Sequence, residues 1–530
     1  MADKKIVLIL NAGQEYIRHT DDDERKYAAQ LNRLFEAVTD TYIPLLNAFE
    51  SLERDGIPFK VGLVLSPVLC NLLEDPVVQK QYSEWIERRL EIGKREIERN
   101  ASVPARLEIA KLCFEKNQEA AISYAKYNQK IIRKFYEFQK KGFVEILATC
   151  GTDIFLPQYS DIPEVMSAQV ETGLYAYKAS FGEVPDGFWL PEMGYYPGIE
   201  KILKAYGMNY TVLDSRSFLF SENEPEKGIF YPARFENSLA VFARDSRCDA
   251  EIFGEDGFAS GKAYLDINKD IGFELPAEEL EPFVTKGEPR YSFGYAYCKK
   301  EASVAKENTY SYSDAAAHCM ADAETFVSRR ETVLKEAEKL LPDTDVVSLV
   351  VTVSLNKLRS VWNEGIYWIE CLFRAAAQKK VQFECARNLL GNQYQLQRIR
   401  PYYGSSSGVG YGEDLLSSKN NWMLRYVRKA SRRMVDLSER FPADTGLKAR
   451  LLNLGAKELM LAQSCGWAKM IHNNDFPEYA RMRFNRSIND FTAVFDALGS
   501  NTVSTEWLTK LENEHQIFPW MNYRIFNRKR

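Results

Sequence analysis

Glu192 is the carboxylate whose sequence context points most strongly to chemistry. It follows a short apolar run in the segment Gly187-Phe-Trp-Leu-Pro-Glu192-Met-Gly-Tyr-Tyr-Pro-Gly198. A carboxylate at the end of a buried strand, fixed by a preceding proline and surrounded by aromatic rings, suits a nucleophile. The alternative is a structural glutamate paired with an arginine. Because barrel enzymes carry their reactive groups at the carboxyl ends of strands, we favour the functional interpretation.

Seven apolar runs bounded by turn residues are strand candidates: 6–11, 59–66, 144–150, 187–192, 210–214, 239–244 and 346–354. Their last residues are Asn11, Ser66, Cys150, Glu192, Asp214, Arg244 and Ser354. Most of these runs are continuous rather than alternating, as in a parallel sheet covered on both faces by helices. Amphipathic stretches between several of them predict a (β/α) barrel or a doubly wound sheet. Either fold gathers the strand ends at one face.

Two regions depart from this alternation and predict additional domains. Residues 75–141 are charged and helix-patterned, which indicates a helical insertion after the second strand. Residues 404–412 (Gly-Ser-Ser-Ser-Gly-Val-Gly-Tyr-Gly) read as a flexible linker or loop, and four helices are expected beyond it. We therefore predict a barrel of residues 1–74 and 142–403, the insertion at 75–141, and a C-terminal helical domain at 404–530.

Histidine and cysteine usage argues against a metal or cofactor. The four histidines are His19, His318, His472 and His515, and no two stand at a metal-ligand spacing. The nine cysteines include no Cys-x-x-Cys pair. They disfavour a disulfide framework and fit reduced thiols in the cytoplasm.

Composition narrows the class of ligand. The chain has 530 residues, 74 of them acidic and 69 basic, so its net charge of −5 disfavours a nucleic-acid or anionic-membrane partner. No apolar stretch approaches the ~20 residues of a membrane span, and the run 6–10 is too short for a signal peptide. Aromatic residues make up 13 %, which suits flat ligands such as sugars but also an ordinary aromatic core.

At the Glu192 segment the sequence resembles glycoside hydrolase family 57, and most of all its branching-enzyme and α-amylase-like members. Residues 34–46, 271–273 and 461–464 look like family segments too. The resemblance implies an incomplete seven-stranded (β/α)7 barrel with a helical insertion and a C-terminal helical domain. It also implies retaining chemistry on α-1,4-glucans, with Glu192 at the nucleophile position. Arg244, followed by Asp245, stands where the family has an arginine facing substrate.

Several family motifs are altered here. The family's His-x-His after strand one is Asn11-Ala-Gly13, and the histidine of its second motif is Asp153. Arg33 stands where the family has a tryptophan. By resemblance Ser354 replaces the general acid of the fourth motif, of which Trp362, Glu364 and Gly365 survive. The fifth motif, Ser-Ser-Asp-Trp, becomes Ser464-Cys-Gly-Trp467 and loses another acid.

A serine hydroxyl cannot replace a carboxylic acid at neutral pH, and general acid–base help is worth about 10²–10⁴-fold. We therefore expect a catalytically inactive or impaired family member that binds α-glucan, another oligosaccharide or a protein partner. The expected substrate-contacting side chains are Trp189, Tyr195, Arg244, Trp362 and Trp467. One alternative is an active branching enzyme or glucanotransferase whose acid has been rebuilt from Asp153, Glu15 or Asp214. Another is a different reaction on the same scaffold.

Four cations stand at unusual places near the expected site: Arg33, Lys357, Arg359 and Lys469. They favour either an anionic ligand or internal pairing with Glu15, Asp153 and Glu192. An unpaired buried charge costs several kcal/mol, so internal pairing is the expected outcome. Such pairing is expected to close part of the cleft.

Overall fold

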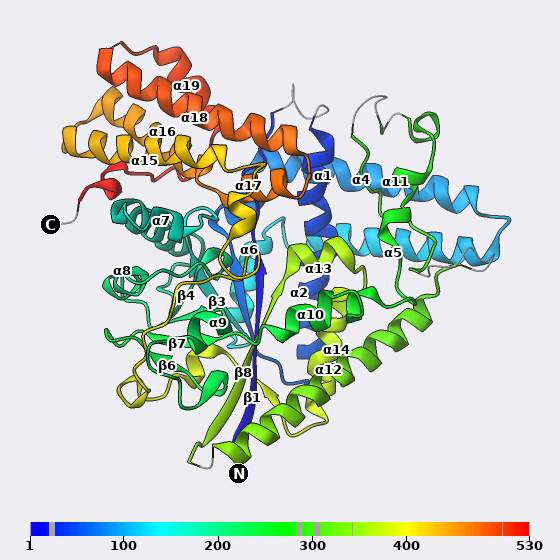
Figure 1. Ribbon diagram of the computed structural model, residues 1–530. Coiled ribbons are helices and arrows are strands. Elements are labelled where there is room, and N and C mark those ends of the chain that lie inside the picture. Colours follow the sequence, from blue (N-terminus) through cyan, green and yellow to red (C-terminus); the bar gives the residue numbers. More distant parts are fainter. Residues whose placement is uncertain are drawn as a thin grey trace.

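A curled, mostly parallel sheet lies at the centre of the structure (Figure 1). This computed structural model describes residues 2–20, 27–281, 283–284, 289–300, 308–341, 343–500 and 502–528. The seven expected strands are confirmed as β1 (Asp3–Ala12), β2 (Val61–Leu65), β3 (Val144–Thr149), β4 (Gly187–Trp189), β5 (Tyr210–Leu213), β7 (Ala240–Ala243) and β8 (Val346–Ser354). Two short strands, β6 (Ala233–Arg234) and β9 (Gln382–Phe383), join them.

The strand order is β6-β7-β5-β4-β3-β2-β1-β8, with β9 also pairing with β1. All pairings are parallel except β6 with β7. The curl brings β7 back toward β8, where the Asp245 amide donates to Val350 O at 2.7 Å. Every residue of β2 and β3 is buried, which explains their continuous apolar sequences. The expected incomplete (β/α)7 barrel is confirmed.

Helices cover the sheet and begin at recognisable signals. The helices of the barrel region are α1 (Ala28–Ala37), α2 (Ile43–Arg54), α3 (Pro67–Glu74), α7 (Pro163–Phe181), α8 (Ile199–Ala205), α9 (Ser215–Leu219), α10 (Arg247–Phe253), α11 (Ile271–Glu274), α12 (Tyr312–Leu340), α13 (Leu355–Val361) and α14 (Gly365–Ala377). Ser66 is the N-cap of α3, and its Oγ accepts from Leu69 N at 3.3 Å. Pro67, which follows Ser66, supplies the fixed φ that suits the first helical position.

The expected helical segment after β2 consists of α4 (Pro76–Arg99), α5 (Pro104–Lys126) and α6 (Ile131–Lys140). Asp75 caps α4 through Oδ1, which accepts from Val77 N at 2.8 Å, and its other oxygen pairs with buried Arg18 at 2.8 Å. In Figure 1 the α4–α5 pair extends away from the sheet on the side opposite α15 and α16.

Beyond residue 412 the chain is helical: α15 (Trp422–Arg440), α16 (Gly446–Ala462), α17 (Cys465–His472), α18 (Pro477–Ser500) and α19 (Thr505–Glu514). Figure 1 shows these helices gathered at one end of the sheet, with α17 nearest the strands. The Cys465 amide donates to Asp153 O at 2.7 Å, which ties α17 to the loop after β3. The four expected helices are confirmed, and α17 was not expected as a separate helix. The predicted domain boundaries stay predictions.

None of the described helices is long and apolar enough to cross a membrane.

Candidate functional site

A cavity of about 990 Å³ opens at the carboxyl ends of the strands. It is lined by five of the seven expected strand-end residues: Asn11, Ser66, Glu192, Arg244 and Ser354. Cys150 and Asp214 are fully buried and do not line it. Glu192 and Ser354 thus share one cavity, as the comparison of the fourth motif requires.

Glu192 lies just beyond β4, in a single turn with Pro191 and Met193. Its φ of 54° places it in the left-handed region, which is costly for a residue with a side chain and is common at functional sites. The loop 404–412 fixes this turn, because the Ser406 amide donates to Glu192 O at 2.7 Å. That loop is therefore anchored to the site and is not a free linker.

Lys469, on α17, forms an ion pair with Glu192, with Nζ 2.5 Å from Oε2. Burial alone would lower the pKa of Lys469, but the Glu192 carboxylate outweighs it and raises that pKa well above its ordinary value. The lysine is thus charged at neutral pH. Its charge opposes that of Glu192, the carboxylate that the sequence predicts to be the nucleophile.

Ser354, the last residue of β8, lies beside Asn11 in the parallel register of β8 and β1. Its side chain is the N-cap of α13, with Oγ accepting from Lys357 N at 3.3 Å. Further along the same turn, Asn356 Nδ2 donates to Gly13 O at 2.6 Å. Residues 354–356 therefore offer hydroxyl and amide groups but no carboxyl group, at the place where the family resemblance predicts the general acid.

Glu15 and Asp153 occupy the space beside Gly466 and Gly13, respectively. A Cβ atom placed on Gly466 would lie 1.6 Å from Glu15 Oε1, and one placed on Gly13 would lie 2.6 Å from Asp153 Oδ2. The carboxylate of Asp153 thus occupies the space that a side chain at residue 13 would need, and that of Glu15 the space that one at residue 466 would need. The sequence alone did not reveal this, because each carboxylate is distant in the chain from the position whose space it fills.

Burial raises the pKa of both carboxyl groups. For Asp153 burial is the main cause, the charges of Glu15 and Glu192 add to it, and Lys469 opposes it, giving a pKa of about 7. Burial also raises the pKa of Glu15, against the opposing charges of Arg33 and Lys469. The pKa of Asp153 is therefore raised into the neutral range.

The Asp153→Asn substitution is expected to change how stability depends on pH. A pKa raised from 3.8 to about 7 means that the folded wild type loses stability as pH rises from about 4 through 7. The asparagine variant lacks this loss, so its advantage over wild type grows across that window, by at most ~4 kcal/mol. Urea unfolding at pH 4.5 and pH 8 measures it, with exposed Asp256→Asn as control. An advantage that is equal at both pH values would contradict the raised pKa.

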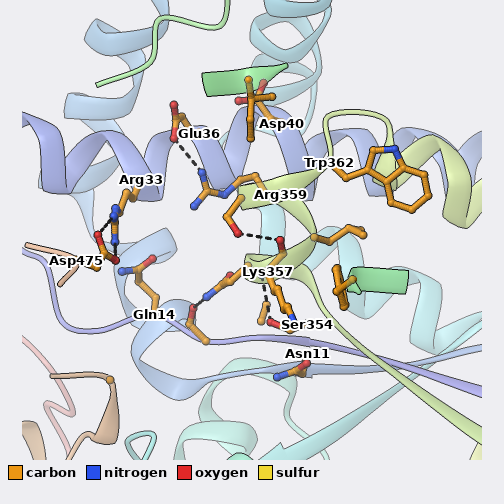
Figure 2. A pocket seen from close by; sticks show the side chains of 18 of the residues that line it. Asn11, Gln14, Arg33, Glu36, Asp40, Ser354, Lys357, Arg359, Trp362 and Asp475 are labelled. Carbon is orange, nitrogen blue, oxygen red and sulfur yellow. Dashed lines mark hydrogen bonds and ion pairs between the residues drawn. The ribbon is translucent and has the colours of Figure 1, made fainter. Parts of the chain in front are cut away.

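Three of the four unusual cations pair with carboxylates, and only one of these carboxylates is among the three that were predicted. Figure 2 shows Arg33 against Asp475 and Arg359 against Glu36, the latter pair at 2.9 Å. Lys357 Nζ lies 4.5 Å from the centre of the Phe253 ring. Only Lys469 pairs with one of the three predicted carboxylates. These pairs leave a cavity of about 990 Å³, and the partly closed cleft stays a prediction.

The expected substrate-contacting residues separate into two groups. Trp189, Arg244 and Trp362 line the cavity, although each is at most 5 % exposed. Tyr195 and Trp467 do not line the cavity, which corrects the prediction that they contact substrate there. The Tyr195 hydroxyl bonds Glu200, and the Trp467 indole N–H donates to Leu461 O at 2.9 Å. The spacing of aromatic residues in the sequence could not distinguish rings that line a cavity from rings in the core.

Arg244 is held by carboxylates on both sides. Its Nε lies 2.8 Å from Asp214 Oδ2 and its Nη1 2.5 Å from Asp249 Oδ2. Asp214 is fully buried, also caps α9 and pairs with Arg216. Asp214 is therefore unavailable as a rebuilt acid, which corrects that alternative and leaves Asp153 and Glu15.

Among the described residues, one group of three side chains has potential metal-ligand atoms within 4.8 Å of one another: Glu458, Asp490 and His515. It belongs to the C-terminal helices and lies outside the cavity.

Comparison with known proteins agrees with the fold. A 1,4-alpha-glucan branching enzyme of Thermococcus kodakarensis is 25 % identical over 523 residues, covering 91 % of this chain and 72 % of that protein. The alpha-amylase AmyC of Thermotoga maritima superposes with a TM-score of 0.91 at 26 % identity over 100 % of both chains. The branching enzyme of Pyrococcus horikoshii shares the fold, with a TM-score of 0.88 at 22 % identity over 99 % of this chain and 97 % of that one.

Two family models match the chain. One describes the C-terminal region of 1,4-alpha-glucan branching enzymes and matches residues 426–526, which span α15 to α19. The other describes glycosyl hydrolase family 57 and matches residues 7–348, from β1 into β8. The chain therefore belongs to glycosyl hydrolase family 57.

Proposed function

We propose that the protein binds α-1,4-glucan chains in the cavity at the strand ends and does not cleave them by the retaining mechanism. The observation that supports this proposal most is Ser354, which stands at the position of the general acid with its hydroxyl committed to capping α13. Retaining cleavage needs two carboxyl groups about 5–5.5 Å apart, one as nucleophile and one as acid and base. Glu192 is the first of these, and Ser354 cannot be the second.

The ion pair with Lys469 is a second support. A nucleophilic carboxylate must leave its partner to attack the anomeric carbon, and an ammonium 2.5 Å away stabilises the unreacted ground state. The family membership and the open cavity support glucan as the ligand. Tyr196, Tyr402 and Tyr411 are 41–57 % exposed, and Tyr411 belongs to the loop 404–412 that is anchored to Glu192. Such rings suit sugar faces.

A second candidate is an active retaining α-glucan enzyme of the branching type, in which Asp153 is the acid and base. The activities named for the similar proteins favour it. So does the pKa of Asp153, because a carboxyl group that titrates near pH 7 can both donate and accept a proton. Asp153 lines the same cavity as Glu192, and the charge of Glu192 helps to raise the pKa of Asp153.

Calorimetric titration with maltoheptaose tests binding. We expect a dissociation constant tighter than about 100 μM, which corresponds to ~5.5 kcal/mol. Trp189→Ala, which removes a ring that lines the cavity, is expected to weaken binding about tenfold or more. The Tyr394→Ala variant removes a 79 % exposed ring outside the cavity and serves as control. Absence of heat with the wild type would exclude glucan as the ligand of this cavity.

Restoring the acid alone is not expected to restore cleavage. In Ser354→Asp the carboxyl returns, but Asn11, Gly13 and Asp153 still replace the family's histidines, and Lys469 still pairs with Glu192. We expect amylose to remain unbranched and uncut, as judged by iodine staining and reducing ends. Measurable turnover by this single variant would show that the rest of the site is still competent.

A further inference from the structure

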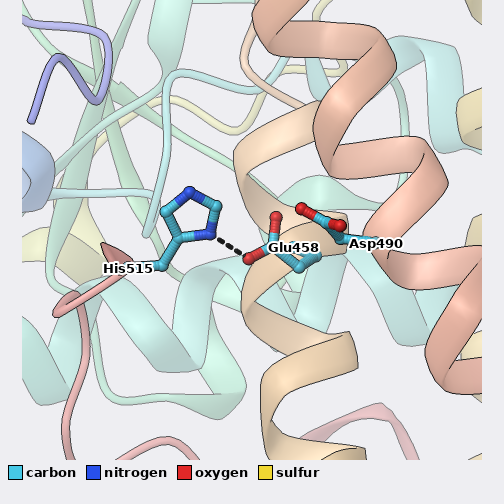
Figure 3. A group of neighbouring side chains, drawn as sticks. All are labelled: Glu458, Asp490 and His515. Carbon is cyan, nitrogen blue, oxygen red and sulfur yellow. Dashed lines mark hydrogen bonds and ion pairs between the residues drawn. The ribbon is translucent and has the colours of Figure 1, made fainter. Parts of the chain in front are cut away.

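Glu458 of α16, Asp490 of α18 and His515, which follows α19, converge inside the C-terminal helices (Figure 3). One ligand atom from each residue lies within 4.8 Å of the others. Glu458 is fully buried and His515 is 2 % exposed. The three residues are separated by 32 and 25 positions in the chain, so no spacing in the sequence marks them as a group.

Two carboxylate oxygens of this cluster have no hydrogen-bond donor. His515 Nδ1 bonds Glu458 Oε1, whereas Glu458 Oε2 has no hydrogen-bond partner although it is buried. Figure 3 shows the Asp490 carboxylate beside that of Glu458. Asp490 Oδ2 has no hydrogen-bond donor, and Arg486, whose Nε lies 3.7 Å away, also pairs with Glu514. Lys457, on the neighbouring position of α16, interacts with the charges of Glu512 and Glu458.

An unpaired buried carboxylate oxygen is costly, and a cation shared by two carboxylates removes that cost. A donor set of one imidazole nitrogen and carboxylate oxygens suits a first-row divalent cation such as Zn²⁺ better than Mg²⁺, which prefers oxygen ligands alone. We propose that Glu458, Asp490 and His515 bind one divalent cation of the Zn²⁺ class. In this arrangement His515 contributes Nδ1, the nitrogen that bonds Glu458 Oε1, and its proton lies on Nε2, which is buried and has no hydrogen-bond partner.

The cation would join three elements that are distant in sequence. α16 and α18 pack against each other, and the segment after His515 returns to α16, where the Tyr523 amide donates to Asn453 Oδ1 at 2.9 Å. Metal binding is therefore expected to stabilise the docking of residues 515–528. Because a metal that binds only the folded state adds its binding free energy to folding, the melting temperature reports occupancy.

The experiment uses the full-length protein after treatment with EDTA and dialysis. Zn²⁺, Mn²⁺ or Mg²⁺ is then added, and bound metal and melting temperature are measured. We expect about one Zn²⁺ per chain and a rise of several degrees with Zn²⁺, and no rise with Mg²⁺. Glu458→Gln, Asp490→Asn and His515→Gln should each lose most of the bound Zn²⁺.

Matched controls separate this site from surface binding. Asp496→Asn changes an exposed acid on the same helix as Asp490, and His318→Gln changes an exposed histidine. Both should bind Zn²⁺ as the wild type does. If a cluster variant folds poorly, hydrogen exchange of residues 515–528 in the wild type with and without Zn²⁺ decides, and slower exchange with Zn²⁺ is expected. A wild type without bound Zn²⁺, exchange that Zn²⁺ does not change, or controls that lose the metal as the cluster variants do would overturn the proposal.

Discussion

Replacing Trp362 by alanine is expected to lower the free energy of unfolding by about 3–5 kcal/mol. Trp362 touches the cavity but is only 1 % exposed, and its ring packs 5.0 Å from that of Tyr264 and 5.4 Å from that of Trp368. The substitution removes a large buried side chain from a rigid aromatic group, so a cavity remains. Urea unfolding followed by circular dichroism measures the loss.

The control for Trp362→Ala is Tyr394→Ala, whose ring is 79 % exposed and whose loss should change stability by no more than about 0.5 kcal/mol. If Trp362→Ala kept wild-type stability and lost only maltoheptaose binding, Trp362 would be a sugar platform rather than a core residue.

Gly466→Ala is expected to destabilise the protein by about 1–3 kcal/mol, the usual range for overpacking. The added methyl group would lie 1.6 Å from Glu15 Oε1 and 2.5 Å from its Cδ, so the half-buried Glu15 side chain must move. Glu15→Ala should therefore rescue Gly466→Ala, giving a coupling energy comparable to the single loss in a double-mutant cycle.

The matched control for Gly466 is Gly499→Ala, another helical glycine, near which an added Cβ would meet nothing within 4 Å. Helix propensity alone should stabilise this variant by up to about 1 kcal/mol. If Gly466→Ala behaved like Gly499→Ala, the carboxylate of Glu15 would not occupy the space beside residue 466.

The strands could be predicted from sequence because fully buried parallel strands are continuous apolar runs bounded by turn residues. Strand ends were less informative. Ser66, Asp214 and Ser354 are of types that suit a reactive group, but these same types cap helices, and the structure shows all three as N-caps. Glu192 is not an N-cap: in the structure it lies inside the turn Pro191–Met193, with φ in the left-handed region.

The site could be predicted only in part. The family resemblance predicts that Ser354 stands where the family has its general acid, and the residue types predicted internal pairing of the unusual cations. The partners of two of these cations could not be predicted: Arg33 pairs with Asp475 and Arg359 with Glu36, across 442 and 323 positions of the chain. The burial of Tyr195 and Trp467 was also missed, because aromatic residues suit cores and sugar sites equally. A protein partner stays a prediction, as does a different reaction on this scaffold.

The most direct test of the central claim compares the wild type with Glu192→Gln on amylose, by iodine staining and by the release of reducing ends. An uncleaving glucan-binding protein predicts that the two proteins are indistinguishable from each other and from buffer over many hours, while the wild type still binds maltoheptaose. Branching or hydrolysis by the wild type that Glu192→Gln abolishes would contradict this account. If Asp153→Asn abolished that activity as well, Asp153 would be the acid of an active enzyme.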